Sequence, residues 1–279
     1  MLAYSVPYLV RARHLARNGR PVPRERVACY LGGLVVLAGA ELVPSDDRFS
    51  LHMVEHLLIG DVAALLLVLG LTGPVLAPVL RRTSPLRVLA HPLVALPLWA
   101  LDLYVWHLPV LYEGAVHHPG VHGLEHACFL FFSVNLWMAL LGPLPKPAWF
   151  GNLGRLGYVV LARLTGAVLG NVFLWAEHPF YDGVYPRLSD QSLAGSIMMI
   201  EESVLTIGLL CWLFLRAAAQ HEERDALVEL GADPDRAMRA VRAGRGDALR
   251  ARLSEAGRAP GGEADVLLEG SGEREQQRL

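Results

Sequence analysis

Two stretches of the chain share one pattern: Ser50-Leu51-His52-Met53-Val54-Glu55-His56-Leu57-Leu58-Ile59-Gly60 and Val121-His122-Gly123-Leu124-Glu125-His126-Ala127. Each places two histidines four residues apart, with a glutamate directly before the second, at the start of a long apolar run. On a helix, side chains four residues apart project from one face, about one turn apart. Two such pairs can therefore converge on one metal ion.

The composition is that of a membrane protein. Of the 279 residues, 53% are hydrophobic and 19% are charged, and the mean hydropathy is +0.35. An ordinary globular domain is richer in charge, so a polytopic membrane protein is indicated. The net charge of −2 gives no indication of a nucleic-acid partner. The three cysteines lie far apart in apolar runs, which argues against a disulfide framework or a zinc ribbon.

Six apolar stretches approach the roughly 20 residues that a bilayer core requires. They are residues 27–43, 51–71, 88–106, 122–141, 156–175 and 194–215. The sequence therefore predicts an all-α polytopic transmembrane helix bundle of about six spans. Three parts are expected: a basic N-terminal segment (1–26), the bundle (27–216) and a charged tail (217–279) that is partly disordered.

The basic residues are concentrated before the first predicted span and in alternate loops, with Arg81, Arg82 and Arg87 in one loop and Lys146 and Arg155 in another. The positive-inside rule then places both termini in the cytoplasm. In this orientation most histidines fall at the outer ends of spans or in outer loops. These are His52, His56, His107, His117, His118, His122, His126 and His178.

Helical rise places a ring of nitrogen and oxygen donors at similar depth near the outer face. The third span runs in the opposite direction and brings in Asp102, with His107 near its exit. The candidate metal ligands from this reasoning are His52, Glu55, His56, Asp102, His107, His122, Glu125 and His126.

Imidazole ligands suit copper, zinc, iron and nickel, and a thioether such as that of Met53 favours Cu(I). Interfacial histidines bonded to water and headgroups are the structural alternative. His-x-x-Glu-His is also a zinc-protease pattern. A protease needs a third ligand and an open water-filled cleft, whereas the duplicated pattern favours one shared site.

Four charged residues are predicted deeper in the bilayer. Asp61, Arg163, Glu201 and Glu202 lie in three different spans at depths that agree within about two turns. We expect an ion pair between Asp61 and Arg163, with Glu202 as a further partner, that stabilises helix packing. The alternative is a proton or ion relay.

Two further segments carry local signals. Asp190, at the start of the sixth span, is expected either to cap that helix or to have a ligand or docking role. Asp233-Pro234 reads as an N-cap followed by proline at the first helical position, so a short helix to about Leu253 is expected. The glycine- and glutamate-rich tail from residue 259 is expected to be disordered.

The ordered set of motifs resembles the CtaG family of caa-type cytochrome c oxidase assembly factors. The resemblance rests on His52-Met53-Val54-Glu55-His56, Trp106-His107-Leu108-Pro109, Leu124-Glu125-His126 and Asp190-Gln191-Ser192-Leu193-Ala194-Gly195. It implies a multi-pass protein of the bacterial plasma membrane that is needed for oxidase maturation, with copper as the metal and immature oxidase subunits as partners. The positions that resemble family motif residues are His52, His56, His107, His122, His126 and Asp190.

The chain departs from the family pattern in the first motif. Glu55 and Leu57 stand where the family more often has glutamine and methionine. A second thioether ligand is therefore missing, which favours a histidine and carboxylate site. The family also implies a full span before the arginine-rich segment, where this chain has only the short apolar run of residues 1–10.

The predicted function is a carrier, not an enzyme: an assembly factor that holds or passes copper at the outer face. Zinc is the alternative metal. Three other functions stay open, namely a metal-free assembly scaffold, a membrane zinc metalloprotease and a copper transporter.

Overall fold

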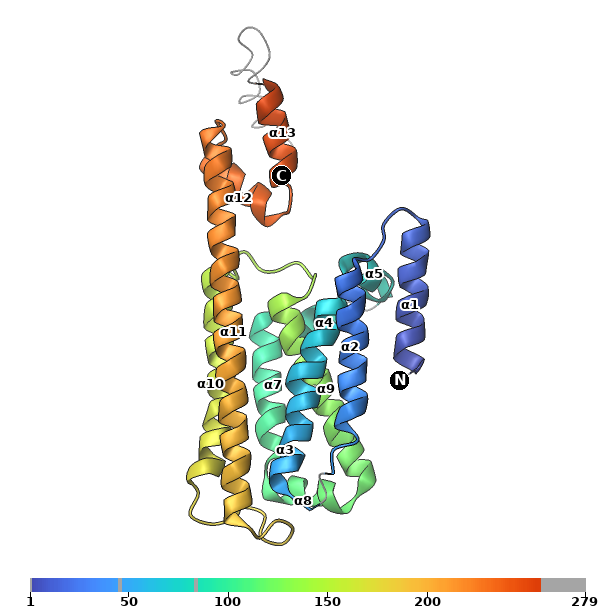
Figure 1. Cartoon of the computed structure of the whole chain (residues 1–279), viewed down its shortest axis with the longest axis vertical. Helices are drawn as coiled ribbons and strands as arrows, with labels where there is room; N and C mark the ends of the chain where they lie inside the picture. The colour runs from blue at the N-terminus through green and yellow to red at the C-terminus, as the bar shows by residue number, and fades with distance from the viewer. Residues whose placement is uncertain (1, 45–46, 83–84, 257–279) are drawn as a thin grey trace. The chain divides into compact units, whose positions relative to one another are not determined.

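The computed structural model describes residues 2–44, 47–82 and 85–256, and the regular structure in these ranges is entirely helical (Figure 1). The predicted disorder from residue 259 lies outside the described residues. The helices are α1 (Leu2–Arg17), α2 (Arg24–Ala40), α3 (Phe49–Leu57), η1 (Leu58–Ala63), α4 (Ala64–Gly70), α5 (Gly73–Arg82), α6 (Pro85–Leu89), α7 (Pro92–Trp106), α8 (Pro109–His117), α9 (Pro119–Leu141), α10 (Asn152–Trp175), α11 (Leu188–Glu229), α12 (Pro234–Arg242) and α13 (Gly246–Ala256).

The chain divides into two compact units, Met1–Leu209 and Leu210–Leu279. The boundary lies inside α11, a few residues before the expected end of the bundle at residue 216. Within the second unit, Asp233 caps α12 as the sequence predicts, because its Oδ1 accepts a hydrogen bond of 2.9 Å from the Arg236 N–H. The single helix expected to reach Leu253 is instead two helices, α12 and α13.

Among the described residues, four helical segments are long and apolar enough to cross a bilayer: Phe49–Gly70, Pro119–Leu141, Asn152–Trp175 and Leu188–Glu229. The bent pair α7 and α8 makes a fifth if it counts as one span. The predicted count was about six. The difference is the first expected span, because α2 has only 17 residues and the 22-residue segment Phe49–Gly70 is the first to qualify.

Proline explains where α7 ends and α8 begins. Pro109 has no N–H and disfavours helical geometry in the residue before it, and Leu108 is extended with ψ of 134°. The chain turns by 70° between the two helices. His107 lies at this bend.

The segment formed by α3, η1 and α4 packs against two neighbours, because α2 and α9 both contact η1 and α4 (Figure 1). Helix α9 also contacts α7 and α8. Ala40, Ile59, Trp106 and Phe129 form a buried apolar cluster where these helices meet. This packing brings the beginnings of α3 and α9 together.

The segment η1 is π-helical, which the sequence pattern does not predict. It follows His56 directly and contains Asp61. A π-helical turn changes the angular position of every later residue on a helix, and such turns occur frequently at functional sites.

Candidate metal centre

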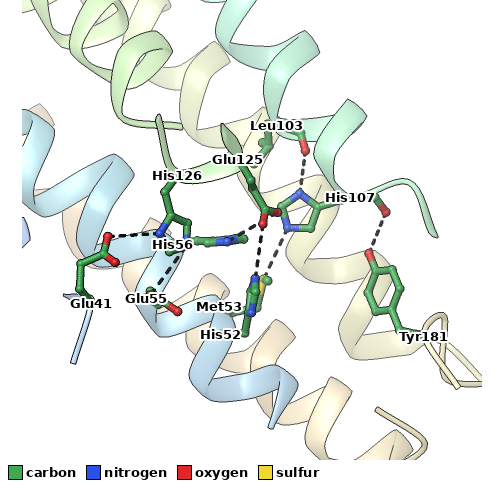
Figure 2. Close-up of polar contacts among 10 residues, drawn as sticks. All are labelled: Glu41, His52, Met53, Glu55, His56, Leu103, His107, Glu125, His126 and Tyr181. Atoms are coloured by element: carbon green, nitrogen blue, oxygen red, sulfur yellow. Dashed lines mark hydrogen bonds and ion pairs between the residues drawn. The ribbon is translucent and has the colours of Figure 1, made fainter. Parts of the chain in front are cut away.

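The two sequence repeats meet in the structure. His52, Glu55 and His56 lie on α3, and Glu125 and His126 face them from α9 (Figure 2). All five side chains are buried, and Glu125 is 0% exposed. The imidazole rings lie close together. The distance between ring centroids is 4.3 Å for His52 and His56 and 5.6 Å for His56 and His126.

Glu125 lies between the two imidazoles of α3. Its Oε2 is 3.9 Å from His52 Nε2, and its Oε1 is 3.7 Å from His56 Nε2. Both distances exceed the length of a hydrogen bond. Among the described residues, neither Glu125 oxygen and neither His56 ring nitrogen has a hydrogen-bond partner. Burying such groups unsatisfied costs about 1–3 kcal/mol each, and more for a charged group.

The buried imidazoles and carboxylates of the cluster have the spacing of metal ligands. In one group His52, His56, His122 and Glu125 each offer an atom within 4.8 Å of the others, and in a second group Glu55, His122 and His126 do so. Ligands of one tetrahedral ion at metal–nitrogen distances near 2.0 Å lie about 3.3 Å apart. The observed 3.7 and 3.9 Å need only a small inward movement to reach that spacing. The residues therefore fit a divalent or monovalent transition metal.

Glu41, which the sequence pattern did not identify, is a further neighbour of His126. Its Oε1 lies 3.3 Å from His126 Nδ1, while His126 Nε2 lies 3.7 Å from Glu55 Oε1. The Glu41 side chain is 57% exposed, so it links the cluster to the surface. The signal that could have identified it is an acid at the end of the apolar run 27–43, the same end of the bundle as the histidine pairs.

His107 lies beside the cluster but belongs to neither ligand group. Its Nδ1 is 2.6 Å from the Leu103 carbonyl oxygen, so Nδ1 carries the proton and Nε2 is left as an acceptor. Nε2 lies 3.5 Å from the sulfur of Met53. The Tyr181 hydroxyl donates to the His107 carbonyl oxygen at 2.7 Å. Burial raises the pKa of Tyr181, which keeps that donor protonated.

Asp102 and Asp190 are also outside both ligand groups. Asp102 is buried, and its Oδ2 has no hydrogen-bond partner within the described ranges. Asp190 accepts hydrogen bonds from the Phe49 N–H at 2.7 Å and from Ser50 Oγ at 2.5 Å. Asp190 thus accepts hydrogen bonds from the first turn of α3, a different helix from its own.

The histidines predicted at the outer ends separate into two sets. His52, His56, His107 and His126 are buried, and His122 is half-buried beside them. His117, His118 and His178 are exposed and belong to neither ligand group.

The predicted ion pair is confirmed. Arg163 Nη2 lies 2.9 Å from Asp61 Oδ1, and Nη1 lies 3.2 Å from Glu202 Oε2. Glu201 is a third carboxylate at 3.8 Å. The guanidinium also lies over the rings of Trp99 and Trp137 at 5.9 and 5.4 Å. These contacts join α10 and the first part of α11 to η1.

Comparison with known proteins supplies independent information. A family model described as cytochrome c oxidase caa3 assembly factor matches residues 6–220. Two uncharacterized proteins, from Mycobacterium bovis and from Mycobacterium tuberculosis, are each 26% identical over 226 residues, covering 69% of this chain. The match covers 34% of each relative, so the chain spans about a third of their length. No solved structure matches the chain.

Proposed function

The chain belongs to the cytochrome c oxidase caa3 assembly factor family, and we propose that it assists oxidase assembly by holding copper in the cluster formed by α3 and α9. The observation that supports this proposal most strongly is Glu125, a fully buried carboxylate between two imidazoles and without a hydrogen-bond partner among the described residues. A bound cation would satisfy the carboxylate and both imidazoles together.

Copper is the metal we favour. Imidazole nitrogen binds copper, zinc, iron and nickel, so the donors alone are compatible with several metals. The family role in oxidase maturation favours copper, which the oxidase itself requires. Zinc is the alternative. The proposed ligands are His52, His56, His122 and Glu125, with Glu55 and His126 as the second group.

We further propose that the cluster faces the outer side of a bacterial plasma membrane. The support is the distribution of basic residues, which lie before α2, in α5 and α6 between α4 and α7, and from the end of α9 to the first turn of α10. In that orientation the exposed carboxylate of Glu41 faces outward, where metal can arrive and where immature oxidase subunits can collect it.

The role we propose is that of a carrier. A catalytic zinc site keeps three protein ligands and an open position for water. Here three imidazoles and one carboxylate converge, which suits storage of an ion better than hydrolysis. Asp102, His107 and Asp190 remain candidate contributors from their sequence positions, and the His107 ring centroid lies 6.1 Å from that of His56.

The test is complementation in a bacterium that makes a caa3-type oxidase and lacks its own assembly factor. We expect the wild-type chain to restore copper in the purified oxidase. The double variant His52→Ala/His126→Ala should fail when copper is scarce, and added copper should rescue it in part. The matched control His117→Ala/His118→Ala changes two exposed histidines and should behave as wild type.

Each alternative function predicts a different result. A metal-free scaffold predicts full assembly with the His52→Ala/His126→Ala variant. A protease predicts zinc-dependent cleavage of a peptide by the purified protein, abolished by Glu55→Gln. A transporter predicts copper uptake into vesicles that contain only this protein. Any of these outcomes would replace the carrier proposal.

A further inference from the structure

The second unit contains a cavity lined by arginines. Its volume is about 290 Å³, and it lies between α12 and α13. Four arginines line it together with apolar side chains; the lining residues are Arg236, Arg239, Ala240, Arg245, Ala248, Leu249 and Arg252. All four arginines are exposed. Within the described part of the chain, none of the four forms an ion pair with a carboxylate, and the ion pair of this unit joins Arg224 and Asp225.

A defined turn and a small core hold the two helices in place. Gly244 has φ of +65°, which lets the Gly244 and Arg245 N–H groups donate back to the carbonyl oxygens of Val241 and Ala240 at 2.9 and 2.8 Å. The inner faces of the helices are apolar. Leu227, Ala232, Ala237, Val241 and Leu249 form a buried cluster. The arginines therefore project from a fixed scaffold.

The charge of this segment is one-sided. Residues 234–256 contain six arginines and three carboxylates. Four unpaired guanidinium groups around one cavity repel each other, and an anion between them relieves that repulsion. The planar guanidinium group can donate two parallel hydrogen bonds to the oxygens of one phosphate group, which is bidentate binding.

We propose that this cavity binds the phosphodiester headgroup of an anionic phospholipid. The lining supports a lipid because Ala240, Ala248 and Leu249 provide an apolar wall beside the arginines. The candidate span Leu188–Glu229 ends shortly before α12 begins at Pro234, so the chain connects the cavity to a helix that can cross a bilayer. Clusters of four to eight basic residues that follow a membrane helix are typical anionic-lipid sites. This site is separate from the metal cluster and does not depend on the copper proposal.

The test measures hydrogen exchange of the full chain in nanodiscs of phosphatidylcholine, with and without phosphatidylglycerol. Phosphatidylglycerol should slow exchange of the α12 and α13 amides about tenfold. The variant Arg239→Gln/Arg252→Gln should lose this effect. The matched control Arg242→Gln/Arg250→Gln removes the same charge from exposed arginines of the same helices that do not line the cavity, and should keep it.

Three results would overturn the proposal. The first is equal exchange in both kinds of disc for the wild-type chain. The second is an equal loss of the phosphatidylglycerol-dependent protection in both double variants, which would indicate non-specific electrostatic attraction. The third is full protection by inorganic phosphate in phosphatidylcholine discs, which would assign the cavity to free phosphate. Unchanged exchange at Leu227 and Leu249 in the absence of anionic lipid shows that each variant is folded.

Discussion

At the residue scale, the cluster is defined by carboxylates placed against imidazoles. Glu125 lies between the two histidines of α3, and Glu55 and Glu41 lie on either side of His126. The arrangement is reciprocal, since each helix supplies histidines to the glutamate of the other. A carboxylate on the far nitrogen of a metal-binding imidazole fixes its orientation and raises its basicity.

Glu41 is expected to act in this indirect way. Glu41→Gln leaves the shape of the side chain but removes the charge that orients His126 through Nδ1. We expect copper affinity to fall about 10- to 100-fold, the usual loss when a partner of a ligating histidine is removed. The measurement is a copper titration of purified protein against a competing chelator. Asp47→Asn, an exposed acid in the loop after α2, is the control and should leave affinity unchanged.

Arg163 holds three carboxylates in a buried position, so its removal should be costly. Arg163→Ala leaves those carboxylates without their cation, and loss of one partner from a buried ion pair costs about 3–5 kcal/mol. We expect lower expression and a lower thermal unfolding midpoint in detergent. Arg187→Ala, at an exposed arginine, should change stability by less than about 0.5 kcal/mol. Equal stability of the two variants would show that the ion-pair cluster does not hold the helices together.

Lys146, in the loop between α9 and α10, makes stability depend on pH. Its Nζ donates to the Met138 carbonyl oxygen at 2.6 Å, and burial, with the nearby Arg155, lowers its pKa to about 8. The unfolded chain therefore binds more protons than the folded chain between pH 8 and the ordinary lysine value near 10.4. Stability should rise with pH through this window, because the cost of the buried charge is present below pH 8 and is relieved above it.

The check is thermal unfolding from pH 7 to 10.5 for the wild-type chain and for Lys146→Gln. Lys146 is the only lysine in the chain, so no other lysine titrates in this range. The variant should lack the rise. A wild-type profile that is flat or falls through the window would contradict the assignment.

At the element scale, close contact between α2 and α4 places Glu41 beside the cluster. A Cβ added at Gly33 would lie 2.9 Å from the Leu67 backbone nitrogen and side chain, and one at Gly70 would lie 2.7 Å from the Tyr30 backbone nitrogen. Small residues at such points let helix backbones approach closely. The end of α2 then lies close enough to α9 for Glu41 to reach His126.

Adjacent glycines of α2 provide a matched test of this contact. Gly33→Ala should force α2 and α4 apart and destabilise the fold by about 1–3 kcal/mol. Gly32→Ala meets its nearest atom at 4.0 Å and should be neutral or slightly stabilising, because alanine favours helix more than glycine does. Thermal unfolding of the two variants gives the comparison. If both variants lose the same amount of stability, the contact at Gly33 does not set the distance between α2 and α4.

Prolines and periodicity made much of the element structure predictable. The spacing of His52, Glu55 and His56 on a helix, and the N-cap at Asp233, follow from local rules that the structure satisfies. The π-helical segment η1 was not predicted, because the local sequence pattern does not mark it and its packing neighbours include α9, a helix distant in sequence. The break between α12 and α13 depends on the positive φ of Gly244. The residues around Gly244 favour helix, so the sequence predicted one continuous helix.

At the scale of the whole molecule, the sequence predicted an all-α chain and the meeting of the two histidine pairs. It also predicted the partners of Arg163. It did not identify Glu41 or the contact between His107 and Met53, because both depend on the rotation of helices that are distant in sequence. Asp190 accepts a hydrogen bond from the N–H of Phe49 in the first turn of α3, and capping of its own helix α11, one of the two expected roles, is not observed among the described residues. About six spans were predicted, and the described residues contain four or five candidate spans, because α2 has 17 residues.

The central claim is that the paired histidines of α3 and α9 bind copper, and metal analysis of the detergent-purified chain tests it most directly. The two ligand groups share His122, so they compete for one ion, and we predict one copper ion per wild-type chain. The variant with His52, His56, His122 and His126 all changed to alanine should retain none. The control with alanine at the exposed His117, His118 and His178 should retain all of it. Equal copper in the wild-type chain and the four-histidine variant would contradict the claim.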